Sequence, residues 1–171
     1  GGEHEPWLDA ANVDLKAFRD ETYRRVCGAR LQPVLDSLVR MVELGVWVEV
    51  TTLVVPGMND SEGELREIAT FIATQLGPHV PWHVSRFHPD YHMQDGMPTP
   101  PARLQRAYEL GREAGLHYVY VGNLPAAGLE DTHCPGCGHA VIERRGFRVV
   151  TARATDGRCS RCGALIHGVG I

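Results

Sequence analysis

Residues 10–122 alternate between strand-like and helix-like segments, and this alternation limits the fold more than any other feature of the sequence. The most informative unit is 46–60, where a run rich in Val and Thr is too short and too β-branched for a helix. A Pro-Gly turn ends the run. Ser61 and Glu64 then have the spacing of a capping box, in which the Glu64 side chain reaches back to the Ser61 N–H. A strand therefore leads through a tight loop into a helix.

The same unit recurs before and after this strand. Further strand-like runs occupy 10–16, 82–87 and 118–121, and apolar residues at helical spacing mark 31–42, 65–76 and 104–114, with a short helix expected at 20–26. Helical crossovers of this length favour parallel pairing of the strands. Four strands cannot close a barrel, so we expect an α/β fold: the later part of a TIM-like (βα) barrel, or a small parallel sheet in its own right.

Beyond residue 125 the helical periodicity disappears. Two C-x-x-C-Gly knuckles stand 21 residues apart and flank two strand-like runs, 140–145 and 147–154; their cysteines are Cys134, Cys137, Cys159 and Cys162. Thiolates at this spacing are typical tetrahedral ligands of zinc, with bonds of about 2.3 Å. A segment of roughly 40 residues with few large apolar side chains cannot hold a core alone, so metal is expected to contribute to its folding. The tail is therefore interpreted as a zinc-ribbon-like module.

Two alternatives for the four cysteines stay open. Rubredoxin-type iron uses the same ligands, and a pair of disulfides would use the same thiols. The first residues, GGEHEPW, are acidic and polar, unlike a signal peptide, so a cytoplasmic location is expected and metal is favoured over disulfides. Four thiolates leave no open coordination position, which indicates a structural metal.

The charge of the chain divides unevenly. Residues 134–171 contain six Arg and two acidic residues, Glu143 and Asp156, so their net charge is +4. Residues 1–133 therefore carry −8, and the two parts sum to the net charge of −4. An acidic body is unlike a dedicated nucleic-acid binder, although the basic tail leaves that role open through Arg144, Arg145, Arg148 and Arg161. No apolar run approaches the roughly 18–20 residues that span a bilayer, so no membrane partner is expected.

Several polar residues are candidates for a site. Asp14 and Lys16 lie two apart on a strand and face the same side, either as a surface ion pair or as part of a site at the strand's end. The loop residues His88, Asp90 and His92 could suggest a metal-dependent hydrolase, but Pro89 argues against the helical spacing that would aim both imidazoles together. The simplest interpretations make Cys27 a small buried hydrophobe, and make Asn59 and Asp60 helix-entry residues.

Four motifs occur in a fixed order: NVDLK at 12–16, LVVPGMND at 53–60, FHPDY at 87–91 and the terminal cysteine knuckles. Together they resemble the later part of a radical S-adenosylmethionine (SAM) enzyme of the pyruvate formate-lyase activating type. The resemblance covers nearly the whole chain and is strongest to the AmmeMemoRadiSam system radical SAM enzymes, which carry such a cysteine-rich tail. It implies that residues 1–125 form a partial radical SAM barrel and that residues 126–171 form a zinc-ribbon module.

The resemblance also implies cofactors and site residues. SAM and a [4Fe–4S] cluster would lie at the barrel mouth, where reductive cleavage of SAM gives a 5′-deoxyadenosyl radical that abstracts hydrogen from a substrate. Asp14 and Lys16 match the motif that lines the SAM pocket, and His88 matches a histidine near the SAM ribose. Thr51 stands where the activating enzymes tend to carry a basic residue. These four residues are expected on one concave face.

One departure from the family pattern is large. The family holds its cluster through three cysteines in C-x3-C-x2-C, and this chain has no such motif. The chain is therefore interpreted as a fragment of an enzyme. The fragment is expected to be inactive alone, and the full-length enzyme is expected to be active. The resemblance implies work alongside Memo-like and AMMECR-like proteins and does not name the substrate, which could be a protein. The alternative from another class is a zinc-ribbon binding module, for nucleic acid or protein, on an α/β scaffold.

Overall fold

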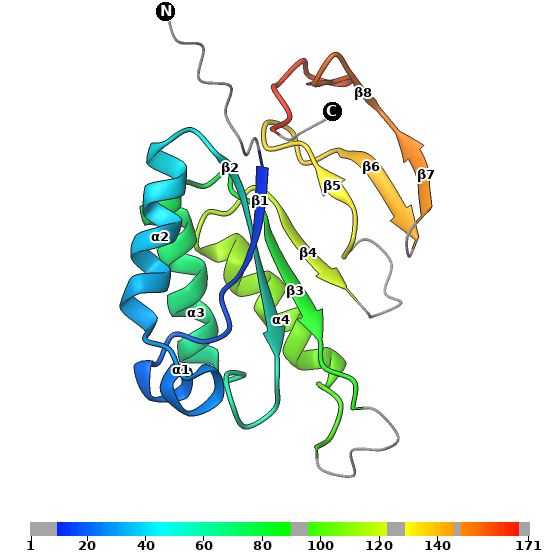
Figure 1. Cartoon of the computed structure of the whole chain (residues 1–171). Coiled ribbons are helices and arrows are strands. Elements are labelled where there is room, and N and C mark those ends of the chain that lie inside the picture. Colours follow the sequence, from blue (N-terminus) through cyan, green and yellow to red (C-terminus); the bar gives the residue numbers. More distant parts are fainter. Residues whose placement is uncertain (1–9, 90–95, 123–128, 146–147, 168–171) are drawn as a thin grey trace, which may run out of the picture.

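The structure is a computed structural model that describes residues 10–89, 96–122, 129–145 and 148–167. Its first part is an α/β unit (Figure 1). The elements in chain order are β1 (Ala10–Asp14), α1 (Asp20–Cys27), α2 (Leu31–Glu43), β2 (Trp47–Val54), α3 (Glu62–Phe71), the π-helical turn η1 (Ile72–Leu76), β3 (Trp82–Arg86), α4 (Pro101–Glu113) and β4 (Val119–Gly122). The alternation expected from the sequence is confirmed, with strand ends that differ by one or two residues.

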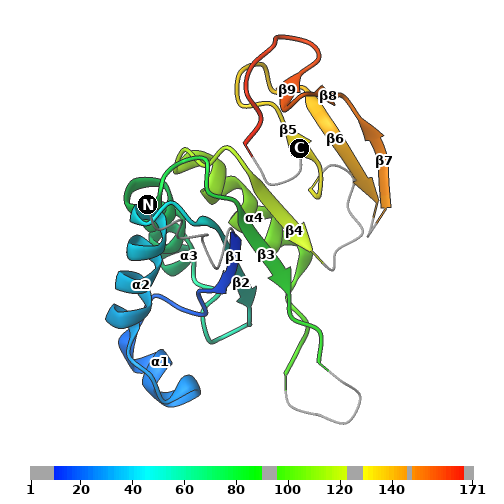
Figure 2. The same cartoon turned by 45° about the horizontal axis from the view of Figure 1, so that its top comes forward.

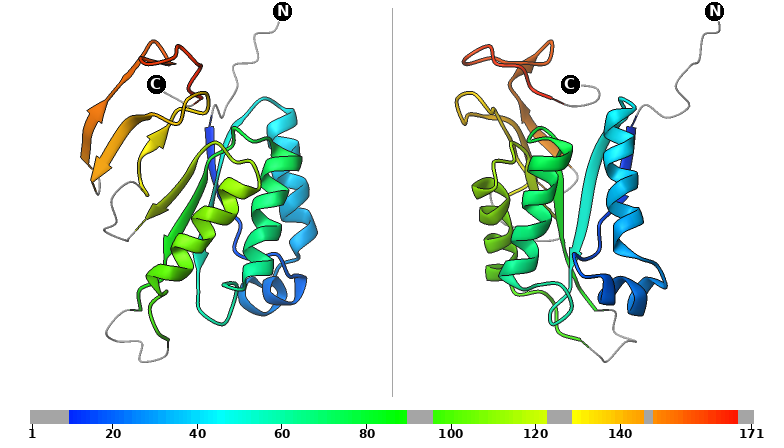
Figure 3. Two further views of the ribbon diagram at one scale, coloured as in Figure 1. Left: turned by 180° about the vertical axis from the view of Figure 1, so that it is seen from behind. Right: turned by 90° about the vertical axis from the view of Figure 1, so that its left-hand side faces the viewer.

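The four strands form one parallel sheet in the order β1-β2-β3-β4. Helices α2, α3 and α4 lie in front of the strands when the molecule is seen from behind (Figure 3). The β2 residues that face these helices are buried, as are Trp82 and Val84 of β3. The alternate residues of the strands are only partly buried. One face of the sheet thus holds the core, and the other is lined by partly exposed side chains.

One row of residues crosses that second face. The register aligns Asp14 with Thr51, Thr51 with His83 and His83 with Tyr120. Side chains at aligned positions of a parallel sheet point to the same face. The expectation that Thr51 is in phase with Glu49 and Leu53 agrees with the alternating burial of β2.

The capping box at α3 is only half formed. Ser61 accepts the expected hydrogen bond from the Glu64 N–H, at 3.3 Å. The Glu64 carboxylate does not return to Ser61; it is buried and accepts from the Phe18 N–H, at 3.0 Å. The prediction for this side chain was wrong because a loop 46 residues away offers it a buried donor. Glu64 therefore ties the β1–α1 loop to α3.

The tail is a small antiparallel unit beside β4 (Figure 2). It contains β5 (Thr132–His133), β6 (Ala140–Arg145) and β7 (Arg148–Ala152) in one sheet, and β8 (Ala154–Thr155) with β9 (Arg158–Cys159) in another. The run expected at 147–154 is therefore broken after Ala152, and its Phe147 lies outside the described residues. The domain boundary expected at 125 also falls in a segment that is not described.

The tail packs against β4 through two tyrosines. Tyr118, which is 2% exposed, shares a hydrophobic cluster with Val141 and Ile166 of the tail. The Tyr120 hydroxyl hydrogen-bonds Thr132, at 2.9 Å, and the Val121 N–H donates to the Leu129 carbonyl, at 2.8 Å. The two parts of the chain are thus joined by packing and by hydrogen bonds.

The structure also tests the expected burial of Cys27 and the expected lack of a membrane-spanning helix. Cys27 is exposed at the end of α1, so its interpretation as a buried hydrophobe is wrong. Among the described residues, no helix is long and apolar enough to cross a membrane.

Candidate functional site

The best-defined site is the four-cysteine centre of the tail. The sulfur atoms of Cys134, Cys137, Cys159 and Cys162 all lie within 4.8 Å of one another. Cys134 Sγ is 3.5 Å from Cys162 Sγ, and Cys137 Sγ is 3.8 Å from Cys159 Sγ. Tetrahedral ligands with bonds of about 2.3 Å stand roughly 3.8 Å apart, so the donor set fits a four-thiolate metal ion. All five cysteines are free, which removes the disulfide alternative for this structure.

The two knuckles have the same local structure. The Gly138 N–H donates to the Cys134 carbonyl and the Gly163 N–H to the Cys159 carbonyl, both at 2.8 Å. Each glycine has a φ near +75°, at +74° and +77°, which a side chain would disfavour. In each knuckle a backbone N–H also points at the first sulfur, from Gly136 at 3.3 Å and from Arg161 at 3.4 Å. These donors stabilise negative charge on Cys134 and Cys159.

The proton affinities of the thiols agree with a site that requires a cation. Burial raises the pKa of Cys159, but the N–H groups of Cys162 and Arg161 and the neighbouring thiols lower it to about 7. A backbone hydrogen bond at Ala164 lowers the pKa of Cys162, but the adjacent thiols raise it to about 12. A metal cation at the centre would balance the repulsion between these adjacent thiolates.

The site expected at the sheet lies at the carboxyl ends of the strands. Asp14 is the last residue of β1, and both it and Lys16 are exposed. His88, also exposed, follows β3 by two residues, so it lies at the same end of the parallel sheet. Thr51 stands beside Asp14 in the register, and its hydroxyl donates to Asn12 Oδ1, at 2.8 Å. The convergence of all four residues on one ligand stays a prediction.

Lys16 has two properties that sequence reasoning left unused. It is the only lysine of the chain. Its backbone is fixed: its N–H donates to the Tyr23 hydroxyl, at 2.9 Å, and its carbonyl accepts from Asn59 Nδ2, at 2.6 Å. Among the described residues its ammonium makes no ion pair, so a fixed loop presents a positive charge that no described carboxylate neutralises.

Asn59 holds this end of the sheet together. It is 1% exposed, donates to the carbonyls of Lys16 and Leu53 and accepts from the Val55 N–H, at 2.6, 2.8 and 2.7 Å. It thus connects the β1–α1 loop to the end of β2. Asn59 does precede the N-cap Ser61 of α3, but its side chain binds the β1–α1 loop and the end of β2, a role that the sequence interpretation missed.

Sequence reasoning missed a polar array on the partly exposed face of the sheet. Glu49 Oε1 lies 2.7 Å from His83 Nε2, and the His83 ring stacks on Tyr120 with centroids 5.1 Å apart. The hydrogen bond from His83 lowers the pKa of Glu49, against the effect of burial. Glu49 is in phase with Thr51 on β2, which could have indicated its direction, but its partner depended on the register of β3.

The tail contributes to the same array. The Arg144 guanidinium lies over the Tyr120 ring, 5.6 Å from its centroid, and donates to Thr132 Oγ1, at 2.7 Å. Arg144 is therefore engaged by the protein itself, which weakens its proposed role on nucleic acid. The side chains of Arg145 and Arg148 lie outside the described part, and Arg161 is exposed. Asp90 and His92 of the hydrolase alternative are also outside the described residues.

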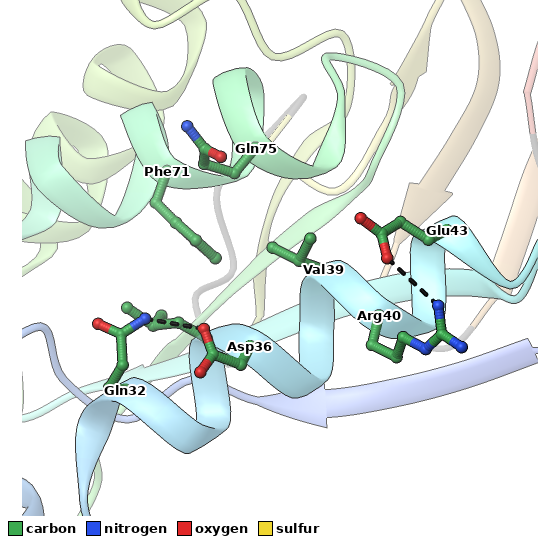
Figure 4. A pocket seen from close by; sticks show the side chains of 8 residues that line it. Gln32, Asp36, Val39, Arg40, Glu43, Phe71 and Gln75 are labelled. Atoms are coloured by element: carbon green, nitrogen blue, oxygen red, sulfur yellow. Dashed lines mark hydrogen bonds and ion pairs between the residues drawn. The ribbon is translucent and has the colours of Figure 1, made fainter.

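Two hollows are lined by none of the candidate SAM residues, cysteine ligands or residues of the polar array. A groove of about 610 Å³ runs between α2 and the end of α3, where Phe71 and Val39 point into it (Figure 4). Polar side chains on its rim hydrogen-bond to one another, for example Gln32 to Asp36. A hollow of about 310 Å³ lies between the β2–α3 loop and the start of α4, lined by Pro56, Asp60, Pro100, Ala102, Arg103 and Arg106. Neither gathers a set of groups that points to a reaction.

Two solved structures that share this fold are a domain of an activating enzyme and a radical SAM methyltransferase. A domain of pyruvate-formate lyase-activating enzyme from Bacteroides vulgatus matches with a TM-score of 0.59 and 16% identity, over 67% of this chain and 68% of that one. A radical SAM methyltransferase from Sphaerobacter thermophilus matches with a TM-score of 0.53 and 21% identity, over 69% of this chain and 35% of that one. These likenesses show a shared fold.

A much more similar sequence comes from an archaeon. The uncharacterized protein MJ0808 of Methanocaldococcus jannaschii is 44% identical over 161 residues, which cover 93% of this chain. The chain spans about half of that relative, 48% of its length. No protein-family model matches the chain.

Proposed function

We propose that this chain forms one wall of the SAM site in a radical SAM enzyme. The observation that carries the proposal is the fold shared with a domain of an activating enzyme and with a radical SAM methyltransferase. Parallel α/β folds place their sites at the carboxyl ends of the strands. The residues that match the family's SAM-lining motifs lie at that end, on β1 and after β3.

The residues at this end suit the charges of SAM. The Lys16 ammonium would attract the carboxylate of SAM, and the Asp14 carboxylate would accept from its amino group. His88 would lie against the ribose. Thr51 supplies a hydroxyl in place of a basic side chain, so Lys16 would be the main cationic contact. Asn59 would position Lys16 through the backbone, because its amide binds the Lys16 carbonyl.

The described residues do not fit a [4Fe–4S] cluster. Such a cluster needs three grouped thiolates beyond those of another metal site. The four grouped cysteines form the tail centre, and Cys27 stands alone on α1. The described residues therefore supply no cluster through which a reaction step could run. The proposal places the cluster ligands, and with them hydrogen abstraction from a still unidentified substrate, in a longer protein of which this chain is a part.

For the tail centre we propose Zn²⁺ in a structural role. The support is the sulfur spacing and the closed set of four thiolates, which leaves no position for a substrate. Iron would use the same ligands, so metal analysis of the purified protein decides between them. The partnership with Memo-like and AMMECR-like proteins also stands as a proposal, supported by the motif resemblance alone. The cytoplasmic location is a proposal supported by the paired cysteine knuckles, which favour metal over disulfides.

The single lysine allows a direct test of SAM binding. Reductive methylation with ¹³C-formaldehyde labels Lys16 and the terminal amine, and a Lys16→Arg sample assigns the Lys16 signal. We expect SAM to shift this signal in a saturable way. The shift should weaken in Asp14→Asn and persist in Asp36→Asn, which removes an exposed carboxylate of α2. A Lys16 signal that SAM leaves unchanged in folded protein would contradict the proposal.

A second assay concerns the missing cluster. After anaerobic reconstitution with iron, sulfide and a reductant, residues 1–171 should produce no 5′-deoxyadenosine from SAM. A longer protein that contains this chain should produce it. Production by residues 1–171 alone would refute the assignment of the cluster ligands to another part of the protein.

A further inference from the structure

Three histidines from separate segments meet where the tail reaches the amino-terminal ends of the strands. His79 precedes β3, His117 precedes β4, and His167 follows the last elements of the tail. The His167 ring centroid is 5.4 Å from that of His79 and 6.3 Å from that of His117. We refer to these three residues and Tyr118 as the histidine joint. It lies at the opposite end of the sheet from Lys16 and His88.

Two hydrogen bonds of Tyr118 hold the end of the tail at the histidine joint. The Tyr118 oxygen accepts from the His167 backbone N–H, at 2.9 Å, and the hydroxyl also lies within hydrogen-bond distance of His167 Nδ1, at 3.0 Å. Burial raises the pKa of Tyr118, so the hydroxyl keeps its hydrogen. Release of His167 would therefore break two contacts of one buried side chain.

The groups around the joint all disfavour additional positive charge. Arg112 donates to the carbonyls of Leu116 and His117, at 3.0 and 2.6 Å, so its guanidinium is held beside the joint. His117 Nδ1 is buried and has no hydrogen-bond partner within the described part of the chain. Burial lowers the pKa of His79 and of His117; His167 lowers both further, and Arg112 and His79 also lower that of His117.

Among the described residues, the other rings at the joint are aromatic and uncharged. The Trp47 ring of β2 lies 6.1 Å from His79, and the Tyr118 ring meets His117 edge-on at 6.0 Å. On β5, His133 is also near Arg112, but the charge that favours its protonated form comes from Asp131. His133 is adjacent to the metal ligand Cys134 and is not a member of the histidine joint.

We propose that the histidine joint is a pH-sensitive latch that holds the segment 165–167 against the sheet at neutral pH and releases it in mild acid. Protonation of His79 or His117 places a cation beside Arg112 and His167. Repulsion between these groups weakens the contact between the tail and β4.

The sign of the effect follows from linkage. The docked state lowers the pKa of His79 and His117 below the ordinary value of 6.5. The released state therefore binds more protons between the lowered and the ordinary pKa. Docking is fully favoured above about pH 6.5 and is lost as the pH falls through the lowered values. Uptake of one proton changes the docking equilibrium by up to about tenfold per pH unit.

Hydrogen exchange of the metal-loaded chain tests the latch. Amide protection of 118–121 and 164–167 is measured from pH 7.5 to 5.5 and corrected for intrinsic exchange rates. We expect protection to fall with pH in the wild type, to be nearly pH-independent in His79→Gln/His117→Gln, and to be low at both pH values in Tyr118→Phe. His88→Gln, which removes an exposed histidine at the opposite end of the sheet, should behave as the wild type.

Bound metal is measured in the same samples, because acid also protonates thiolate ligands. Loss of protection must occur while the metal is still bound. Constant protection from pH 7.5 to 5.5, or an unchanged pH dependence in the double variant, would overturn the proposal. So would loss of protection that appears only when the metal leaves. None of these outcomes depends on SAM binding, so the latch and the proposed function fail independently.

Discussion

Replacement of Asn59 by alanine should be among the most destabilising single changes in the α/β unit. The variant leaves three groups without their partner: the carbonyls of Lys16 and Leu53 and the N–H of Val55. At a position only 1% exposed, each lost hydrogen bond costs about 1 kcal/mol or more. The free energy of unfolding should therefore fall by about 3 kcal/mol, a large part of the stability of a small domain.

The matched control removes the same side chain from the neighbouring strand. Asn12 is exposed, and its side chain makes one hydrogen bond to the described residues, from Thr51, so Asn12→Ala should cost less than about 1 kcal/mol. Urea unfolding of the metal-loaded proteins, followed by far-ultraviolet circular dichroism, gives both values from transitions of equal slope. Equal losses in the two variants would refute the argument that Asn59 clamps the β1–α1 loop to β2. Asn59→Asp keeps the acceptor but loses both donors, so it should not restore stability at neutral pH.

Two other changes test the packing and the metal. A Cβ on Gly111 of α4 would lie 2.8 Å from Val119 Cγ2 and 3.1 Å from the Trp82 ring, so Gly111→Ala should destabilise by about 1–3 kcal/mol in thermal unfolding despite the better helix propensity of Ala. Gly63→Ala in α3, where a Cβ would meet nothing within 4 Å, should instead stabilise by about 0.5–1 kcal/mol, and the reverse order would contradict the close approach of α4 to the sheet. Cys137→Ser should abolish stoichiometric metal binding and amide protection in β5 and β6 while β2 and β3 stay protected; retention of one metal ion per chain would exclude the four-thiolate centre.

Features that depend on local periodicity could be predicted from the sequence. The strands and helices follow from alternating and helical spacing of apolar residues, and the four-cysteine centre follows from the knuckle spacing. Features that depend on distant partners could not. Glu64 leaves its capping role for the Phe18 N–H, and Asn59 binds a carbonyl 43 residues away. His83 gains significance only when the register places it between Thr51 and Tyr120.

The exposure of Cys27 also had no local signal. Helix α1 is short and lies at the surface, so its small apolar positions are not all turned to the core. The candidate SAM residues also combine a feature that local periodicity predicts with one that it does not. The place of Asp14, Lys16 and His88 at or just beyond the strand ends follows from the sequence pattern, because parallel strands end at one edge. Their convergence on a ligand depends on side-chain directions, which periodicity does not determine.

The anchoring of the tail by Tyr118 has a consequence for the order in which the chain assembles. The contact between Tyr118 and His167 closes a loop of 49 residues. A metal ion joins Cys134 to Cys162, which are 28 residues apart, and removes that stretch from the loop. The effective loop then shortens to about 21 residues, which lowers the entropic cost of closure by about 0.7 kcal/mol. Metal capture should thus precede and accelerate attachment of the tail, so refolding without metal should show a slower final phase.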